Sequence, residues 1–321
     1  MPLRGRARDG DQTALHEGLG QVKAKKAVVI QSLTSIHFLI AYACSAECDH
    51  CFMWGSPRRH SGMTAAQVDG FLDQVVSLET VTRVCAEGGE CFVHYDLLLH
   101  FLRGAARRGL SVSALTNASW VRSRAQAEER VAELMAAGLS SLGVSTDEWH
   151  RKAIPVERVD TLLEVCAAAG LAANRMETRL EGVMFRGRAA ERLAPFAPTR
   201  PAGAFTACPH EKLAAPSRLH LDCYGRLHLC QGLCLGAGDS AASCAAYDAA
   251  AHPIVRLLLD GGPHALARFA AGRGFDLQAG YADACHLCYR AREFLRADFL
   301  DLLGPDEMYG DRPPRCAPHQ E

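Results

Sequence analysis

Residues 35–51 read SIHFLIAYACSAECDHC. The first nine of them form a nearly continuous apolar run of strand length, which predicts a strand buried on both faces of a sheet. Three cysteines follow at once, Cys44, Cys48 and Cys51, with the spacing C-x3-C-x2-C. Three thiolates on one tight loop can hold three corners of a metal cluster and leave a fourth iron open to a small molecule. The alternative is three buried, apolar cysteines at a strand-to-loop junction.

Strand and helix patterns alternate on the C-terminal side of this stretch. A helix is predicted over residues 64–78, because Thr64 and Gln67 form a capping box ahead of an apolar face. Three later helical patterns end in Gly-Leu, at Gly109, Gly138 and Gly170, where a glycine satisfies a left-handed cap. We predict strands over residues 35–43, 82–87, 111–117, 141–147, 172–180 and 182–185. Strands that alternate with helices in this way form a parallel sheet with helices outside it, so the fold class is α/β.

The alternation stops near residues 195–201, a segment rich in Pro and Ala that is typical of a linker. Beyond it, residues 217–230 alternate through a Tyr224-Gly225 turn and predict a β-hairpin. Residues 283–299 have a helical pattern. We therefore expect three parts: an N-terminal extension (1–30), a strand–helix core (31–200), and a smaller C-terminal domain with a loose tail (201–321).

Composition and charge exclude several classes of protein. The chain has 321 residues, 49% of them apolar and 22% charged, which suits a protein with a large core. Lys and Arg (35) balance Asp and Glu (36), so neither nucleic acid nor an anionic membrane is an expected partner. No apolar run is long enough to span a membrane, and residues 1–27 contain no signal-peptide core, which predicts a cytoplasmic protein. Because disulfides are rare there, the 14 cysteines indicate metal or redox chemistry.

The loop CSAECDHC, residues 44–51, resembles the signature loop of the radical S-adenosylmethionine (SAM) superfamily. The resemblance implies a partial (β/α)6 barrel of the TIM type. It also implies that Cys44, Cys48 and Cys51 bind a catalytic 4Fe–4S cluster, whose fourth iron is chelated by the amine and carboxylate of SAM.

The same resemblance implies the remaining SAM contacts. Gly88, Gly89 and Glu90 correspond to the motif that binds the SAM amino group, with Cys91 where the family usually has proline. Further contacts are expected from Thr116 and Asn117, from Ser145 and Asp147 at the ribose, and from His50 and Phe52 near the adenine. All of them fall at the ends of successive predicted strands, the edge where α/β barrels assemble their sites.

A second group of cysteines lies in the C-terminal part: Cys208, Cys230, Cys285 and Cys288. A hairpin and a helix start can bring four thiolates together and complete a closed 4Fe–4S or zinc site. The pattern is similar to the twitch domain, a short relative of the SPASM domain, which implies one auxiliary 4Fe–4S cluster. A zinc-stapled hairpin is the alternative, and Cys223 and Cys234 are near enough in sequence to compete as ligands.

Two other features allow two interpretations each. The Arg186-Gly187-Arg188 segment could hold a carboxylate of SAM or of the substrate, or it could begin a solvated helix. His150 is expected on a surface loop, with an acid–base role as the alternative.

The implied reaction is reductive cleavage of SAM to methionine and a 5′-deoxyadenosyl radical, which abstracts hydrogen from a substrate that is then oxidised or rearranged. Electrons would come from a reductant such as flavodoxin or ferredoxin. Relatives with this kind of C-terminal domain modify ribosomal peptides, aminoglycoside-type sugars or cofactor precursors. We expect a small-molecule or peptide substrate. The absence of N-terminal room for a leader-peptide-binding domain favours a small molecule or a separately supplied recognition protein. The auxiliary cluster could accept an electron from the substrate radical or anchor its domain. The competing hypothesis is a non-catalytic iron–sulfur or zinc protein for electron transfer or assembly.

Overall fold

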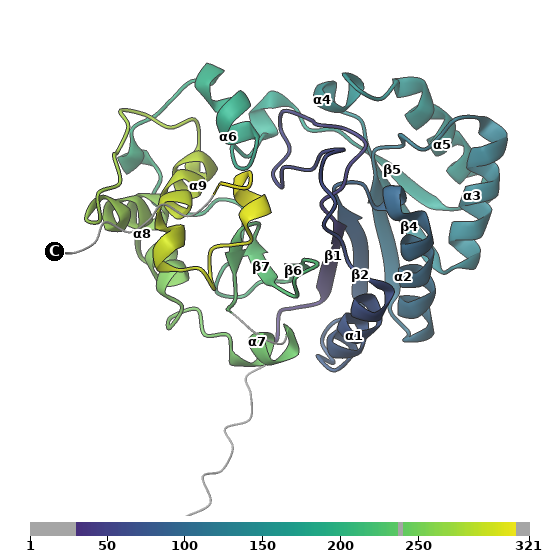
Figure 1. Ribbon diagram of the computed structural model, residues 1–321, viewed down its shortest axis with the longest axis horizontal. Coiled ribbons are helices and arrows are strands. Elements are labelled where there is room, and N and C mark those ends of the chain that lie inside the picture. Colours follow the sequence, from purple (N-terminus) through teal and green to yellow (C-terminus); the bar gives the residue numbers. More distant parts are fainter. Residues whose placement is uncertain (1–29, 237–239, 313–321) are drawn as a thin grey trace, which may run out of the picture.

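The computed structural model describes residues 30–236 and 240–312. Most of the predicted N-terminal extension, and the end of the predicted tail with Cys316, lie outside the described residues. Within them the strands form one eight-stranded sheet in the order β5-β4-β3-β2-β1-β6-β7-β8 (Figure 1). The predicted α/β class is confirmed.

Five parallel strands make up one half of the sheet. They are β1 (Ser35–Ala41), β2 (Arg83–Gly88), β3 (Ser111–Thr116), β4 (Leu139–Ser145) and β5 (Ala172–Met176). The helices α1 (Ala65–Val76), α2 (Tyr95–Arg107), α3 (Arg124–Ala136) and α5 (Val156–Ala169) connect them and cover the outer face (Figure 1). The Thr64–Gln67 capping box is present, and Gly109, Gly138 and Gly170 all have positive φ. The predicted alternation of strands and helices is therefore confirmed for these five strands.

The prediction of a strand over residues 182–185 is wrong. After β5 the chain forms a 3-10 turn, η2 (Leu180–Gly182), and continues without regular structure. The backbone of this segment is bound elsewhere: the Phe185 N–H donates to a carboxylate oxygen of Asp283 (3.3 Å). The Arg188 N–H donates to the Cys51 carbonyl (2.8 Å). These bonds connect the segment to Asp283, ahead of the C-terminal helix, and to the cysteine loop, instead of to a neighbouring strand.

A sixth parallel strand comes from the predicted hairpin. Strand β6 (Arg218–Leu221) pairs with β1 on the side away from β2, and β7 (Leu227–Cys230) and the two-residue β8 (Leu233–Cys234) follow antiparallel. The Tyr224-Gly225 turn is as predicted, because the Asp222 carboxylate accepts the N–H of Tyr224 and that of Arg226 (both 2.9 Å). One sheet thus continues past residue 200, where the division into a core and a C-terminal domain stays a prediction.

The remaining helices lie around the C-terminal strands and above the sheet. They are α4 (Glu148–Arg151), α6 (Ala189–Arg192), α7 (Ser240–Ala246), α8 (Pro253–Ala271) and α9 (Ala284–Leu295), with α8 packed against α9 (Figure 1). The helix predicted over residues 283–299 is thus present as α9. Among the described residues, no helix combines the length and apolar character that crossing a membrane requires.

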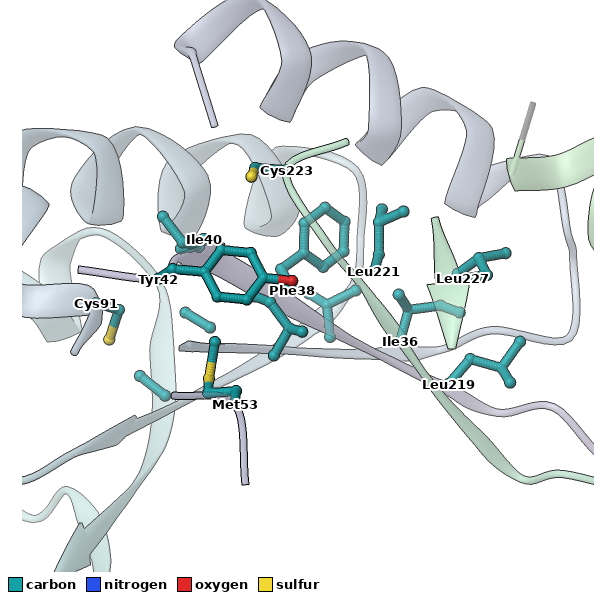
Figure 2. Packing of buried hydrophobic residues seen from close by; sticks show 14 of the residues in the cluster. Ile36, Phe38, Ile40, Tyr42, Met53, Cys91, Leu219, Leu221, Cys223 and Leu227 are labelled. Atoms are coloured by element: carbon teal, nitrogen blue, oxygen red, sulfur yellow. The ribbon is translucent and has the colours of Figure 1, made fainter. Parts of the chain in front are cut away.

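The two faces of β1 have different chemistry. Ile36 and Phe38 pack with Leu219 and Leu221 of β6 (Figure 2), and the Phe38 ring lies 4.8 Å from that of Phe101 in α2. Because strand side chains alternate, His37 points to the opposite face, into the barrel interior. The outer face is therefore an apolar core, and the inner face is partly polar.

Candidate active site

A cavity of about 360 Å³ lies at the carboxyl ends of the parallel strands. Every residue that the sequence predicts to bind the first cluster or SAM lines it: Cys44, Cys48, His50, Cys51, Phe52, Gly88, Gly89, Glu90, Thr116, Asn117, Ser145, Asp147 and Arg186. The fold thus brings together residues from the cysteine loop and from the ends of β2, β3 and β4. Their ligand roles remain predictions.

The cysteine loop after β1 presents three free thiols to this cavity. Backbone N–H groups donate to two of the sulfurs, Ala46 to Cys44 Sγ (3.5 Å) and Gly55 to Cys51 Sγ (3.3 Å). Burial raises the pKa of Cys48 to about 12, and the Cys51 thiol and the carboxylates of Asp147 and Asp49 add to the shift. Burial also raises the pKa of Cys44. Two adjacent sulfurs that are costly to ionise in isolation fit a site in which bound iron supplies the compensating positive charge.

Arg188 forms hydrogen bonds with the backbone of this cysteine loop. Its guanidinium is buried and donates to the carbonyl oxygens of Cys48 and Gly55, both at 2.8 Å. The sequence predicted a carboxylate-binding or solvated role for residues 186–188. The structure instead shows Arg188 donating to backbone carbonyls of the loop, one of them that of Cys48.

The Gly88-Gly89-Glu90 segment joins the end of β2 to the cysteine loop. The N–H of Gly89 donates to the Ala41 carbonyl (2.7 Å), and that of Glu90 donates to the Ala43 carbonyl (2.9 Å). A Cβ on Gly89 would lie 2.1 Å from the Ala43 oxygen, so only glycine permits this approach. The glycines therefore have a structural role beside the predicted contact with SAM.

The Glu90 carboxylate is buried and accepts three hydrogen bonds. The donors are the N–H groups of Phe92 (3.1 Å) and Asn117 (2.7 Å) and the hydroxyl of Thr116 (2.9 Å). Burial nevertheless raises the pKa of Glu90 to about 7. A carboxylate offers about four lone-pair positions, so one remains for an amino group in the cavity. Cys91, in the family's proline position, is fully buried and contacts the Leu115 carbonyl (3.2 Å).

Asp147 bridges two histidines at the end of β4. Its carboxylate lies 3.2 Å from His50 Nε2 and 2.8 Å from His150 Nδ1, and Trp149 stacks on His50. Burial raises the pKa of Asp147, but the hydrogen bonds from both histidines outweigh this and hold it well below its usual range. His150, expected on a surface loop, lines the cavity instead, because Asp147 caps the short helix α4 and turns it inward.

Sequence reasoning missed a polar floor on the other side of the cavity. Glu87 at the end of β2 contacts His37 Nδ1 (3.3 Å) and His220 Nε2 (3.1 Å), and Gln231 lies 3.4 Å from His220. Glu87, His220 and Gln231 line the cavity. Burial raises the pKa of Glu87, but His220 and His37 outweigh it, so the carboxyl stays ionised. Only the pairing of β6 with β1 brings His220 here, and no local pattern signals that pairing.

The second cysteine group also comes together. Cys208, Cys230, Cys285 and Cys288 line one narrow pocket of about 20 Å³. Cys223 and Cys234 do not line it; Cys234 Sγ instead lies 3.4 Å from the Gly304 carbonyl. The geometry therefore favours the four predicted ligands over their two competitors. His210, Asp283 and Cys285 form another possible metal triad beside it, which keeps zinc open as an alternative.

Arg186 lies between the two cysteine sites. Its side chain lines the large cavity and the narrow pocket, and its Nη1 donates to Cys230 Sγ at 2.7 Å. Its guanidinium also lies over the ring of Phe52, 5.5 Å from the centroid. A contact of Arg186 with a carboxylate of SAM or of the substrate stays a prediction.

Comparisons with known proteins agree with this geometry. A family model described as the radical SAM superfamily matches residues 38–193. A curated relative, the S-adenosylmethionine-dependent nucleotide dehydratase of Psychrobacter lutiphocae, is 27% identical over 124 residues, 35% of this chain and 40% of the relative. The chain thus matches less than half of that relative's length.

Among solved structures, BtrN in complex with AdoMet and 2-DOIA superposes with a TM-score of 0.52 and 14% identity, over 72% of this chain and 89% of that one. A second structure, BtrN in an open conformation, gives a TM-score of 0.44 and 13% identity, over 72% and 87%. At this identity the likeness to the first concerns the fold alone.

Proposed function

Because residues 38–193 match the model of the radical SAM superfamily, whose cofactors are a 4Fe–4S cluster and SAM, we propose that this chain is an enzyme that oxidises a small polar substrate. One observation carries the proposal: a single cavity collects the three cysteines of the loop, the ends of β2, β3 and β4, and a polar floor. When bound, the reduced cluster supplies a 5′-deoxyadenosyl radical by cleaving SAM, and the radical abstracts a hydrogen atom from a substrate carbon.

The chain's own residues bind and orient SAM and exclude water. Cys44, Cys48 and Cys51 are the proposed iron ligands, and Glu90 is the acceptor for the SAM amino group. Asp147 is the proposed acceptor for ribose hydroxyls, since its carboxylate is ionised and faces the cavity. Phe52 and His50 supply flat surfaces for the adenine.

The polar floor of the cavity, around Glu87, indicates the class of substrate. Glu87, His220 and Gln231 are all buried and offer charged or hydrogen-bonding atoms to the cavity. Buried polar groups favour a ligand that pairs with them, such as one bearing hydroxyl or amino groups. The cavity of about 360 Å³ lies at the small end of the range of ~300–1,000 Å³ for ligand sites, and the substrate shares it with the cluster and SAM, which leaves little room. We therefore favour a small metabolite over a peptide.

A second 4Fe–4S cluster on Cys208, Cys230, Cys285 and Cys288 completes the proposal. It would take one electron from the substrate radical, whose proton leaves to a base, so that the substrate is oxidised. The shared position of Arg186 supports this role over that of a remote anchor. A flavodoxin- or ferredoxin-type reductant would supply the electron for the first cluster. We propose a cytoplasmic location, where free thiols stay reduced.

The first test is SAM cleavage. Anaerobically reconstituted protein, given dithionite and SAM, should release 5′-deoxyadenosine, and a Cys44→Ala/Cys48→Ala/Cys51→Ala variant should release none. Cys166→Ala is the matched control, because this thiol is fully buried in α5, outside both sites. If SAM binds but is never cleaved, the chain is a non-catalytic iron–sulfur protein and the proposal fails.

The second test counts metal. Iron should fall from about eight to about four atoms per chain in a Cys285→Ala/Cys288→Ala variant. Cys223→Ala should keep about eight, since Cys223 is buried but outside the pocket. Loss of zinc instead of iron, or no loss of metal, would contradict the auxiliary 4Fe–4S assignment.

A further inference from the structure

Two buried arginines surround Cys230. Arg186 is 3% exposed and donates from Nη1 to Cys230 Sγ (2.7 Å). Arg292, on α9, is 1% exposed; its Nη1 donates to the Gln231 carbonyl (3.0 Å), and its Nη2 lies 4.0 Å from the same sulfur. The sulfur of one cysteine therefore lies beside two buried guanidinium groups that both line the narrow pocket.

Within the described residues, neither of these cations is neutralised by a carboxylate. In residues 30–236 and 240–312, neither forms an ion pair with a carboxylate, and the Nε of each is buried without a hydrogen bond. Burying an unpaired charge costs several kcal/mol. Four neutral thiols would leave both charges uncompensated, whereas a cluster held by four thiolates carries net negative charge. The arginines thus fit a pocket built for an anionic metal centre.

We propose that Arg186 and Arg292 raise the reduction potential of the centre held by Cys208, Cys230, Cys285 and Cys288, so that it accepts electrons readily. This inference rests on the auxiliary cluster of the proposed function. Reduction adds one electron to the cluster, and no bond or proton is exchanged. Positive charge and a hydrogen bond at a ligand sulfur stabilise the more negative, reduced form, and both are known determinants of cluster potential. Arg186 has the larger effect because it donates directly at the shorter distance.

Arg186 also connects this pocket with the substrate. Because its side chain lines the large cavity as well, its positive charge lies between the place of the substrate radical and the acceptor. It acts as a positioning residue through Cys230, and the test therefore measures a potential and not only turnover.

The experiment uses full-length protein with the Cys44→Ala/Cys48→Ala/Cys51→Ala substitutions, which keeps the auxiliary centre alone. Its midpoint potential is measured by redox titration with detection by electron paramagnetic resonance. We expect Arg186→Met to shift the potential to more negative values, and Arg292→Met to shift it in the same direction by less. Arg186→Lys should fall between wild type and Arg186→Met, because it keeps the charge without the planar donor.

Arg175→Met is the matched control and should leave the potential unchanged, because Arg175 lies on β5, at the far edge of the sheet. An unchanged or more positive potential in Arg186→Met, with the cluster intact, overturns the inference while the proposed function stands. If Arg186→Met fails to assemble its cluster, the test rests on Arg186→Lys and Arg292→Met. The inference is overturned if the midpoint potential is unchanged in both of these variants. A parent protein without any auxiliary iron overturns the cluster assignment itself.

Discussion

The Glu90 carboxylate accepts three hydrogen bonds and is almost completely buried. Burial raises its pKa from 4.5 to about 7, so the folded protein binds the proton more tightly than the unfolded chain does. Stability from this group is therefore fully present below pH 4.5 and is lost as pH rises through about 7. The residue that is expected to bind the SAM amino group thus destabilises the empty site at neutral pH.

This gives a pH-dependent prediction for Glu90→Gln in the apoprotein. Between pH 5 and pH 8, the difference in unfolding free energy between variant and wild type should change by about 2.5 kcal/mol in favour of the variant. Loss of one acceptor for the Asn117 N–H adds only a constant offset. Urea unfolding at both pH values under reducing conditions measures the change. A difference that is the same at both would contradict the raised pKa.

Substitutions in the polar floor and in the proposed SAM site should have different effects on the rate of SAM cleavage. His220→Ala removes a floor contact of Glu87, away from the proposed SAM contacts, so SAM cleavage in the absence of substrate should stay within about twofold of wild type. Glu90→Ala removes the predicted acceptor and should lower the same rate at least tenfold, the equivalent of about 1.4 kcal/mol. The assay is the initial rate of 5′-deoxyadenosine release with dithionite. Equal losses in both variants would show that the floor belongs to the SAM site.

At the scale of elements, the cysteine loop depends on the irregular segment after η2. Arg188 holds two loop carbonyls from a buried position, whereas Arg192, one turn further, forms ion pairs with Asp49 and Glu47 of the same loop from an exposed one. Surface ion pairs contribute about 0–1 kcal/mol, whereas a buried hydrogen bond to a charged group contributes about 1.5–3 kcal/mol.

We therefore expect Arg188→Met to loosen the first cluster and Arg192→Met to leave it intact. The measurement is the rate at which a chelator removes iron from a protein that already lacks Cys285 and Cys288. Loss should be at least tenfold faster in Arg188→Met. Equal rates in the two variants would mean that the loop keeps its shape without Arg188.

A strand or site residue of this chain can be predicted from the sequence where a local pattern of residues determines it. The strands up to β5 follow from apolar runs and glycine caps, and the cysteines of the first loop follow from their spacing. Residues 182–185 have a strand-like pattern, but the Phe185 N–H bonds to Asp283 and the Arg188 N–H just beyond bonds to the cysteine loop, which no local rule foresees. Likewise, the sequence predicts His220 in a separate hairpin, and only the pairing of β6 with β1 in the structure brings it to the cavity.

At the scale of the whole molecule, this pairing makes the sheet continuous between the barrel and the C-terminal strands. Leu219 of β6 is fully buried and pairs with Ile36, so it belongs to the same core as β1. A protein with such a shared core is expected to unfold as one unit, because neither part can lose its strands without exposing the apolar face of the other.

The tryptophans allow a direct test in a Trp54→Phe background, because the Trp54 indole donates to the Tyr289 hydroxyl of α9 (3.2 Å). Trp120 and Trp149 then remain, and both precede residue 200. Leu219→Ala should cost about 2–5 kcal/mol and lower the denaturation midpoint seen by fluorescence as much as the midpoint seen by circular dichroism. Leu259→Ala on α8 is the matched control, because that side chain is 48% exposed and its loss should move neither midpoint. If Leu219→Ala instead produces two transitions and leaves the tryptophan midpoint in place, residues beyond 200 fold independently. In that case β6 adds to an already stable barrel, and the polar floor would have to be assembled on docking of the C-terminal part.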